Sequence, residues 1–305
     1  MTIQVTTVGA SQCGTSGKKI ITLIAEYPRA IHSQLLTHRL FSKNSSSSRA
    51  IPIKSAIDNV LTNPAEFKWT VNQSGMQGLP LTDPDKLFKV QKSLEAYLKQ
   101  TINFVNYLGL KEEEGGLNIH KQNVGRYLEP FQNIRIVLTS TEWDNWDWLR
   151  IDEAAQGEIE ELALKIKQAR DSADYMLLNE GEYHVPFVNR KRNTDGSIVY
   201  YHPDTDNILT TEEAILISLS VCAQTSYRKE DTTLEKAKDI VDKLFSGAKK
   251  HLSPTEHIAT PIPSFIDHGY DNAEWPKGIT HIDRDHNYWS GNFKDWIQYR
   301  HLKYS

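Results

Sequence analysis

The sequence has little cysteine: Cys13 and Cys222 are the only two among its 305 residues. Two cysteines cannot build the disulfide framework of a small secreted protein, and such usage favours a reducing cytoplasm. No stretch approaches the roughly 20 apolar residues of a membrane span. The N-terminus shows no basic region followed by an apolar core, as a secretory signal would. We therefore expect a soluble cytoplasmic protein with no membrane partner.

An excess of positive charge is also missing. Lysine and arginine number 35 against 39 aspartates and glutamates, which gives a formal net charge of -4. Proteins whose main ligand is a nucleic-acid backbone usually carry a basic excess, so nucleic acid is not an expected partner. A local cationic pocket for a single phosphate is still compatible with this balance. The hydrophobic content of 39% suits a globular protein with an ample core.

Residue patterns predict strands and helices in mixed order. Strands are predicted at residues 19–27 and 134–139, and a β-hairpin turn at Asp195-Gly196. Helices are predicted from Pro28 to about Leu40, over 51–61, from Pro84 to a C-cap at Gly109, over 119–127, over 143–175 with a bend, and after capping boxes at Thr210–Glu213 and Thr232–Glu235. Because no linker divides the chain, the sequence predicts one α/β domain of the α+β type, with a mixed sheet and long helices.

Three patterns resemble a P-loop, a metal site and a cysteine nucleophile, but none of them meets the requirements of that kind of site. In GASQCGTSGKK, Gln12 stands where a P-loop needs glycine and Lys19 where it needs serine or threonine, so a turn between strands is the better prediction. The run HIDRDHNYW, residues 281–289, matches no metal-ligand spacing and predicts a polar loop, with no metal site. Cys222 lies on an apolar helix face as a core residue, and Cys13 lies in a turn without an activating partner.

The stretch THRLFSKNSSSSRAIP, residues 37–52, places one asparagine and four serines in a row between Arg39 and Arg49. Low-complexity serine is often a disordered linker, although apolar sequence stands on both sides here. The alternative is an anion-binding loop, because hydroxyls, backbone N–H groups and arginine are the groups that hold a phosphate dianion. Composition alone leaves both interpretations open.

This stretch resembles the signature of the flavin-dependent thymidylate synthases, commonly written RHRxxSxNxxSxR. The matching positions are His38, Arg39, Ser42, Asn44, Ser47 and Arg49, with Gln34 and Pro28 matching further upstream. The resemblance implies that the serine run is a nucleotide-phosphate loop. It assigns substrate contacts to Gln34, Ser47, Ser48 and Arg49, and flavin contacts to His38 and Arg39.

A second segment, TSTEWDNWDWLRIDEAAQGEIEELA at residues 139–163, resembles a helical signature of the same family. Its matching positions are Asn145, Leu149, Arg150, Ala155, Gln156, Glu158 and Ile159, and Arg126 with Pro130 resembles the R-x-x-x-P stretch upstream. The resemblance implies that Arg150 is catalytic and also contacts the substrate, that Arg126 helps hold the nucleotide phosphate, and that Asn145 and Leu149 face flavin. Two tryptophans on the same turn predict that Arg150 projects from a largely buried helix.

A third resemblance is out of order. CAQTSY (222–227) and KKHLSPTEH (249–257) resemble motifs that precede the arginine-histidine-arginine motif in ordinary members but follow it here. We infer a circular permutation, with residues 211–305 carrying the usual N-terminal motifs and with family-atypical inserts at 52–118 and 176–210. The flavin contacts that this implies are Ser226, His251, Ser253 and Glu256.

Several positions depart from the family pattern, namely Thr37, Ser45, Ala50, Thr139, Thr141 and Ala154. Thr139 and Thr141 stand where members of the family carry Asn and Arg for flavin. We therefore expect the flavin contacts on that side to be rebuilt, by Arg300 or by residues of the inserts.

The resemblance implies an enzyme in which FAD transfers a one-carbon unit from methylenetetrahydrofolate to C5 of a pyrimidine deoxynucleotide monophosphate, with NADPH as reductant. The first hypothesis is a thymidylate synthase that converts dUMP to dTMP. The second is a hydroxymethylase of dUMP or dCMP, which would suit a phage that modifies its DNA precursors in the host cytoplasm. The third is an inactive nucleotide-binding homologue. Sites between the subunits of a homotetramer are expected from the family.

Overall fold

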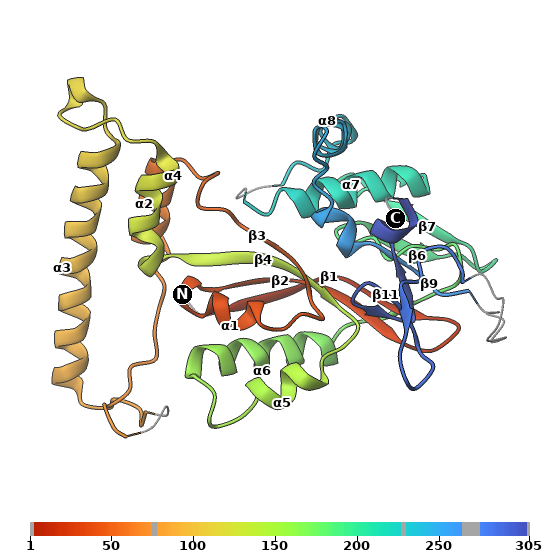
Figure 1. The fold of residues 1–305 in the computed structure, drawn as a ribbon, viewed down its shortest axis with the longest axis horizontal. Coiled ribbons are helices and arrows are strands. Elements are labelled where there is room, and N and C mark those ends of the chain that lie inside the picture. Colours follow the sequence, from red (N-terminus) through yellow and green to blue (C-terminus); the bar gives the residue numbers. More distant parts are fainter. Residues whose placement is uncertain (1–2, 75–77, 227–229, 264–274, 304–305) are drawn as a thin grey trace.

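The computed structural model describes residues 3–74, 78–226, 230–263 and 275–303. Its centre is a five-stranded sheet of order β3-β4-β2-β1-β5, in which neighbouring strands are antiparallel except for the parallel pair β1 and β5. Helices and three smaller sheets surround it, so the fold is α+β with a mixed sheet (Figure 1). The strands of the central sheet are β1 Gln4–Cys13, β2 Lys19–Pro28, β3 Ser42–Ser45, β4 Asn133–Ser140 and β5 Met176–Leu178.

One face of this sheet is covered by helices α5 and α6 and by the short α1 (Figure 1). Alternate residues of β2, such as Leu23 and Tyr27, are fully buried on this face. They pack in one cluster with Ile159, Leu162 and Ile166 of α6. The apolar run that predicted strand 19–27 therefore forms a central strand. The covering helices are α1 His32–Leu36, α5 Asp144–Arg150 and α6 Gly157–Asp171, and a single 3-10 turn, η1 Arg29–Ile31, leads into α1.

The opposite face is covered at one end only. Helix α7 and the 3-10 turn η4 pack there, close to β3 and β4, and the C-terminal strands lie beside them (Figure 1). The helical elements are α7 Thr211–Ala223, α8 Leu234–Phe245, η4 Ser253–His257 and α9 Tyr299–Lys303. The strands are β6 Asn189–Arg192, β7 Ile198–Tyr201, β8 Ile208–Leu209, β9 Ala259–Pro261, β10 His281–Ile282, β11 Tyr288–Ser290, β12 Phe293–Lys294 and β13 Trp296–Gln298.

A separate helical layer stands at the other end of the sheet (Figure 1). Its own small core joins Val60, Val105, Val124 and Leu128. Of the 26 residues of its longest helix, α3, Thr101 and Val105 are the buried ones, so the rest of that helix keeps substantial exposure. The elements of this layer are α2 Ile53–Thr62, α3 Pro84–Gly109, η2 Glu112–Glu114, α4 Lys121–Val124 and η3 Gly125–Phe131.

Most of the predicted elements are present, and the differences have local causes. The helix after Pro28 ends at Leu36 rather than near Leu40, because the following turn buries His38 and Phe41 against Trp146. Gly109 is the last residue of α3 rather than a left-handed cap, and a Cβ there would lie 2.7 Å from Ile53 Cδ1.

Three further predictions were wrong in detail. The cap of α8 is Thr233, one residue later than predicted, because the hydroxyl of Thr232 instead donates to the Asp204 carboxylate. Cys13 is not a turn residue but the buried end of β1, while Cys222 is buried in α7 as predicted and burial raises its pKa. Residues 281–289 form β10, β11 and their connection rather than a plain loop.

Within the described ranges, no group of three or more histidine, cysteine or carboxylate side chains could hold a metal ion. A search of the same residues finds no helix long and apolar enough to span a membrane.

A chain of buried hydrogen bonds crosses the middle of the sheet. His184 bridges Ser11 Oγ at 2.8 Å and Thr22 Oγ1 at 2.9 Å, Thr22 contacts Thr139 Oγ1 at 2.7 Å, and Thr139 contacts His257 Nδ1 at 2.8 Å. All five residues are fully buried. Burial lowers the pKa of His257 to about 3 and holds the pKa of His184 well below its usual range. Both imidazoles are therefore neutral, and the chain links β1, β2, β4 and η4 through neutral groups.

The chain of buried hydrogen bonds allows a prediction for the substitution Thr139→Val. The substitution keeps the side-chain shape but removes the hydroxyl that contacts Thr22 and His257, so both groups lose a buried partner. We expect the free energy of unfolding to fall by about 1–3 kcal/mol, measured by urea denaturation. Thr6→Val, on an exposed face of β1, is the matched control and should change stability by less than about 0.5 kcal/mol. Equal stability of the two variants would contradict this role of the chain.

Candidate functional site

Edge strand β3 is the place where the motif segments meet. Asn44 Nδ2 donates to the Cys222 carbonyl oxygen at 3.1 Å, and the Ser47 backbone N–H donates to Ser226 Oγ at 2.9 Å. These contacts join the serine-rich loop to the end of α7, about 180 residues later in the chain. Tyr227, the last residue of the CAQTSY stretch, lies outside the described residues.

The SPTEH turn reaches the same strands. Its last residue, His257, is hydrogen-bonded to Thr139 of β4, and η4 packs against β3 as well as against α7. The segments that resemble separate motifs of one family therefore pack around β3 and β4, although they are far apart in the sequence.

The serine loop follows one end of β3 and lies against the helical layer. Ser48 Oγ donates to Glu129 Oε1 at 3.0 Å, and the same carboxylate pairs with Arg29 at 3.2 Å. Arg49 and Arg126 are both exposed here, and a Cβ at the neighbouring Gly125 would lie 3.7 Å from the Ser48 carbonyl oxygen. This end of β3 thus gathers Ser47, Ser48, Arg49 and Arg126, the residues predicted to hold the nucleotide phosphate.

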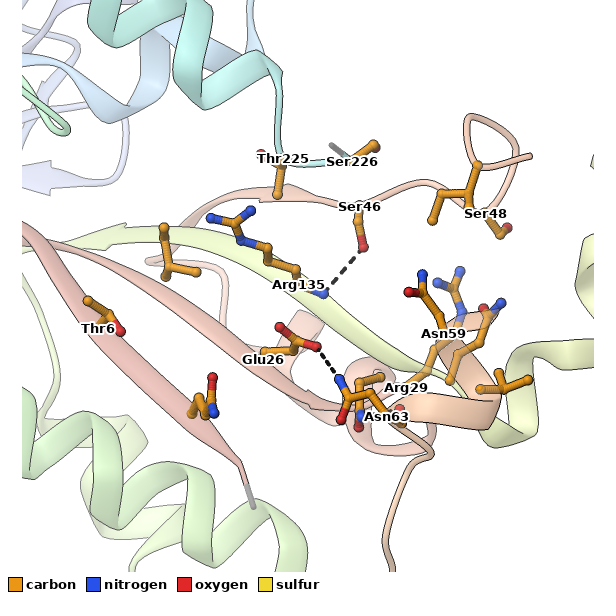
Figure 2. A pocket seen from close by; sticks show the side chains of 16 residues that line it. Thr6, Glu26, Arg29, Ser46, Ser48, Asn59, Asn63, Arg135, Thr225 and Ser226 are labelled. Carbon is orange, nitrogen blue, oxygen red and sulfur yellow. Dashed lines mark hydrogen bonds between the residues drawn. The ribbon is translucent and has the colours of Figure 1, made fainter. Parts of the chain in front are cut away.

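A cavity of about 540 Å³ opens beside this loop, on the part of the sheet that α7 leaves uncovered (Figure 2). Thr225 and Ser226 border it on the α7 side, and Asn59 and Asn63 border it on the side of α2. The volume lies within the usual range of ligand pockets, about 300–1,000 Å³. A small polar molecule can therefore be accommodated next to the serine loop.

The floor of this cavity is charged but internally balanced. Arg135 of β4 pairs with Glu230 at 2.5 Å, and its backbone N–H donates to Ser46 Oγ at 3.3 Å. Glu26 of β2 accepts a hydrogen bond from Asn63 Nδ2 at 3.0 Å (Figure 2). Donors and acceptors thus stand side by side, an arrangement that suits a ligand with both kinds of group.

Arg150 stands near the other end of β3. Its Nε donates to His38 Nε2 at 3.1 Å, and its Nη2 lies 3.4 Å from both the Gln34 carbonyl oxygen and Thr37 Oγ1. Gln34 in turn donates to Gln156 at 2.6 Å. Across the described part of the chain, no ion pair joins Arg150 to a carboxylate. It is a half-buried cation whose charge the protein leaves uncompensated.

The imidazole of His38 is neutral because of its surroundings. Burial, the positive charge of Arg150 and that of Lys43 lower its pKa to about 4. Its ring packs edge-on against Trp146, with ring centroids 4.8 Å apart, and is stacked with Phe41, with ring centroids 5.7 Å apart. Burial also lowers the pKa of Arg150, which nonetheless stays a cation near neutral pH. A neutral His38 can accept the Arg150 N–H and hold the guanidinium in place.

The two tryptophans of helix α5 predicted that the helix is largely buried, and this prediction is wrong. Trp146 is buried, but Trp148 is 76% exposed, because the helix lies on the surface of the layer that it forms with α6. Asn145 and Leu149 are also exposed on this helix, close in sequence to Arg150. The predicted flavin-facing residues of α5 are therefore open to a ligand from outside.

Of the other predicted flavin contacts, Ser226 lies at the serine-loop end of β3, and the rest lie near the Arg150 end or on the surface beside η4. Arg39, His251 and Ser253 are exposed, and Glu256 forms an ion pair with Arg300. His38 and Ser47 flank a strand of four residues, which spans about 13 Å at 3.3 Å per residue. The residues predicted to hold the phosphate thus lie at one end of this short strand. The Arg150 group, which is Arg150 with its contacts His38, Gln34 and Thr37, lies near the other end.

Sequence reasoning did not find several residues of this region. Glu26, Arg29, Asn63 and Arg135 line the cavity, and Gln298 is buried between Ser42 and Glu256. None of them belongs to a motif. The one available signal was the placement of polar residues such as Glu26 and Arg135 in alternation within otherwise apolar strands, which marks an uncovered sheet face.

Comparison with solved structures gives a likeness of fold. No protein-family model matches the sequence, and no curated protein does. A crystal structure of a UMP/dUMP methylase PolB from Streptomyces cacaoi bound with 5-Br UMP is similar in fold, with a TM-score of 0.43 and 14% sequence identity. The likeness covers 57% of this chain and 90% of that chain.

The contact between Arg150 and His38 predicts a shift in Arg150→Ala. Removing the cation takes away one cause of the low pKa of His38 but leaves burial, which is the larger one. We therefore expect the pKa of His38 to rise above about 4 without reaching the ordinary 6.5, as followed by NMR titration. Arg192→Ala is the control, because Arg192 pairs with Glu182 in the β6–β7 region. An unchanged pKa of His38 in Arg150→Ala would contradict the contact.

Proposed function

We propose that this protein is an enzyme that adds a one-carbon unit to C5 of a pyrimidine deoxynucleotide monophosphate in a flavin-dependent reaction, with dUMP as the substrate and dTMP as the product. The observation that carries the proposal is the packing of three separated motif segments around β3 and β4. These segments are far apart in sequence, yet each carries motif residues of one family and all pack at one place. This arrangement is expected if they form one site.

The phosphate of the nucleotide is assigned to the serine-loop end of β3. The Ser47 hydroxyl and the exposed guanidinium groups of Arg49 and Arg126 offer hydrogen bonds to a dianion, whereas the Ser47 N–H and the Ser48 hydroxyl already donate to Ser226 and Glu129. Unlike Arg29 and Arg135, these two arginines have no carboxylate partner within the described part of the chain. Gln34, in the Arg150 group, is assigned to the nucleotide by the motif.

Arg150 is assigned to the pyrimidine ring. C5 of a pyrimidine is a poor nucleophile, and the two cysteines that could add to C6 are both buried. A fixed cation is the alternative, since it stabilises negative charge that develops on the ring. Arg150 suits this role because neutral His38 and the Gln34 carbonyl hold it without cancelling its charge.

The flavin is assigned to the Arg150 end of β3 and to the turn η4. The residues that would hold it there are His38, Arg39, Asn145, Leu149, His251, Ser253 and Glu256, whereas Ser226, the remaining predicted flavin contact, lies at the serine-loop end of β3. An uncompensated cation at Arg150 and exposed polar groups on η4 fit an electron-rich ring system with an anionic tail. When bound, FAD supplies the redox chemistry that methylenetetrahydrofolate and NADPH require. The protein supplies orientation and charge.

A hydroxymethylase acting on dUMP or dCMP is the second candidate, and one observation favours it. Thr139 and Thr141 occupy positions where the family carries flavin contacts, but here both hydroxyls serve the interior. Thr139 contacts Thr22 and His257, and Thr141 Oγ1 accepts from the Lys294 N–H at 3.0 Å. A flavin environment altered in this way is consistent with a different completion of the one-carbon transfer.

Mass spectrometry of the nucleotide products tests the proposal. The protein is incubated with FAD, NADPH and methylenetetrahydrofolate, and with dUMP or dCMP in separate reactions. We expect a methyl adduct on dUMP, and no turnover by Arg150→Ala even though that variant stays folded. A hydroxymethyl adduct on either nucleotide would establish the second candidate. Failure of the wild type to modify either nucleotide while binding flavin would contradict both and leave an inactive binder.

The exposed apolar residues of the helical layer predict association of several copies. Leu79, Phe88, Tyr97 and Tyr107 are each more than half exposed, which is costly for a lone chain. In addition, Arg49 and Arg150 lie near opposite ends of β3, so in an assembly a nucleotide held by Arg49 of one copy can receive Arg150 from a neighbouring copy. The family resemblance implies a homotetramer, so we expect a mass by light scattering of about four times the 34.9 kDa chain. A one-chain mass at micromolar concentration would contradict this.

A further inference from the structure

Gln298, the last residue of β13, joins three segments of the chain. Its Nε2 lies 3.2 Å from Ser42 Oγ, 3.0 Å from Asn292 Oδ1 and 3.3 Å from the Glu256 carbonyl oxygen. The side chain is 2% exposed. An amide buried this deeply is stable only when its polar atoms have partners, so these contacts fix its position.

Two of these partners belong to the motif segments around the site. Ser42 is the serine at the start of β3 and is itself buried, with a second contact to Asn292 at 3.1 Å. Glu256 lies in the SPTEH turn η4. The Gln298 amide is therefore a direct link between β3 and η4, in addition to the Thr139–His257 contact on β4.

Arg300 acts on the same turn from two residues further on. Its Nη1 donates to Glu256 Oε1 as an ion pair. The backbone holds both residues against the strand that follows η4, since Gln298 is paired with Ala259 and the Tyr299 N–H donates to the Ile258 carbonyl oxygen at 2.8 Å. The main chain and the side chain of Glu256 are thus both held by the C-terminal segment.

We propose that the C-terminal segment Trp296–Lys303 is a clasp that positions η4 for cofactor binding, with Gln298 and Arg300 as its positioning residues. Gln298 sets the distance between Ser42 and Glu256, and Arg300 orients the Glu256 carboxylate. The part that concerns flavin rests on the proposed function. That the clasp holds η4 in place can be tested without any ligand.

Loss of a positioning residue changes the local orientation of η4, whereas loss of a stabilising residue lowers the stability of the whole fold. Arg300 is partly exposed, so its loss should affect the fold little, whereas the Glu256 carboxylate would lose its orientation. Arg192 provides a matched comparison, since it also pairs with a single glutamate, Glu182, but lies in the β6–β7 region away from β3.

The first experiment is hydrogen exchange of the backbone amides of η4 in wild type, Gln298→Met, Arg300→Met and Arg192→Met. We expect exchange in η4 to be about tenfold faster in the first two variants than in the wild type. Arg192→Met should leave it unchanged. Should Gln298→Met not fold, Arg300→Met alone decides the question. Unchanged exchange in η4 of Arg300→Met would overturn the clasp, whatever the protein binds.

The second experiment measures the dissociation constant of FAD by fluorescence quenching in the same variants, together with KM for dUMP. We expect Arg300→Met to weaken FAD about tenfold with KM for dUMP unchanged, and Arg300→Lys to recover most of the affinity. A parallel rise of both quantities would overturn a role in cofactor positioning. If the wild type bound no FAD, the proposed function would fail, and the exchange result would still decide the clasp.

Discussion

The pairing of a four-residue edge strand with β4 is the interaction on which the rest of the site depends. From Ser42 opposite Thr139 to Ser45 opposite Ile136, this short ladder sets where the serine loop leaves the sheet and where the turn containing His38 enters it. Because side chains alternate along a strand, Asn44 and Ser46 face α7 and the cavity, while Lys43 and Ser45 face the α1 side. One residue of slippage would exchange these two sets.

Such a short ladder needs support from its neighbours. The Asn44 amide and the Ser47 N–H tie it to the end of α7, the Gln298 amide ties its first residue to η4, and the buried chain through Thr139 ties β4 to His257. Each tie uses a neutral polar group inside the protein, where unmet hydrogen bonds are costly. Neutral groups hold Arg150 in this framework, and within the described residues it has no carboxylate partner, so it stands out as a group for a ligand together with the exposed Arg49 and Arg126.

The sequence allowed the main strands and most helices to be predicted because their signals are local. The run KIITLIAEY and the Asp83-Pro84 start of α3 carry their own periodicity and capping. The turn after α1 could not be predicted, since His38 and Phe41 are fixed by Trp146, more than a hundred residues away. The same holds for the site. Arg150 and Ser47 lie in motifs, but packing that no local pattern encodes brings Glu26 and Asn63 to the cavity and Gln298 to Ser42 and η4.

A crystal structure of the protein with dUMP and FAD would show whether the two ends of β3 form one nucleotide and cofactor site. We expect the phosphate against Ser47, Arg49 and Arg126, and flavin beside His38 and η4. We also expect the Arg150 guanidinium, from the same chain or from a neighbouring copy, against the pyrimidine ring. Nucleotide bound away from the serine loop, or Arg150 facing no ligand in any copy, would contradict these expectations.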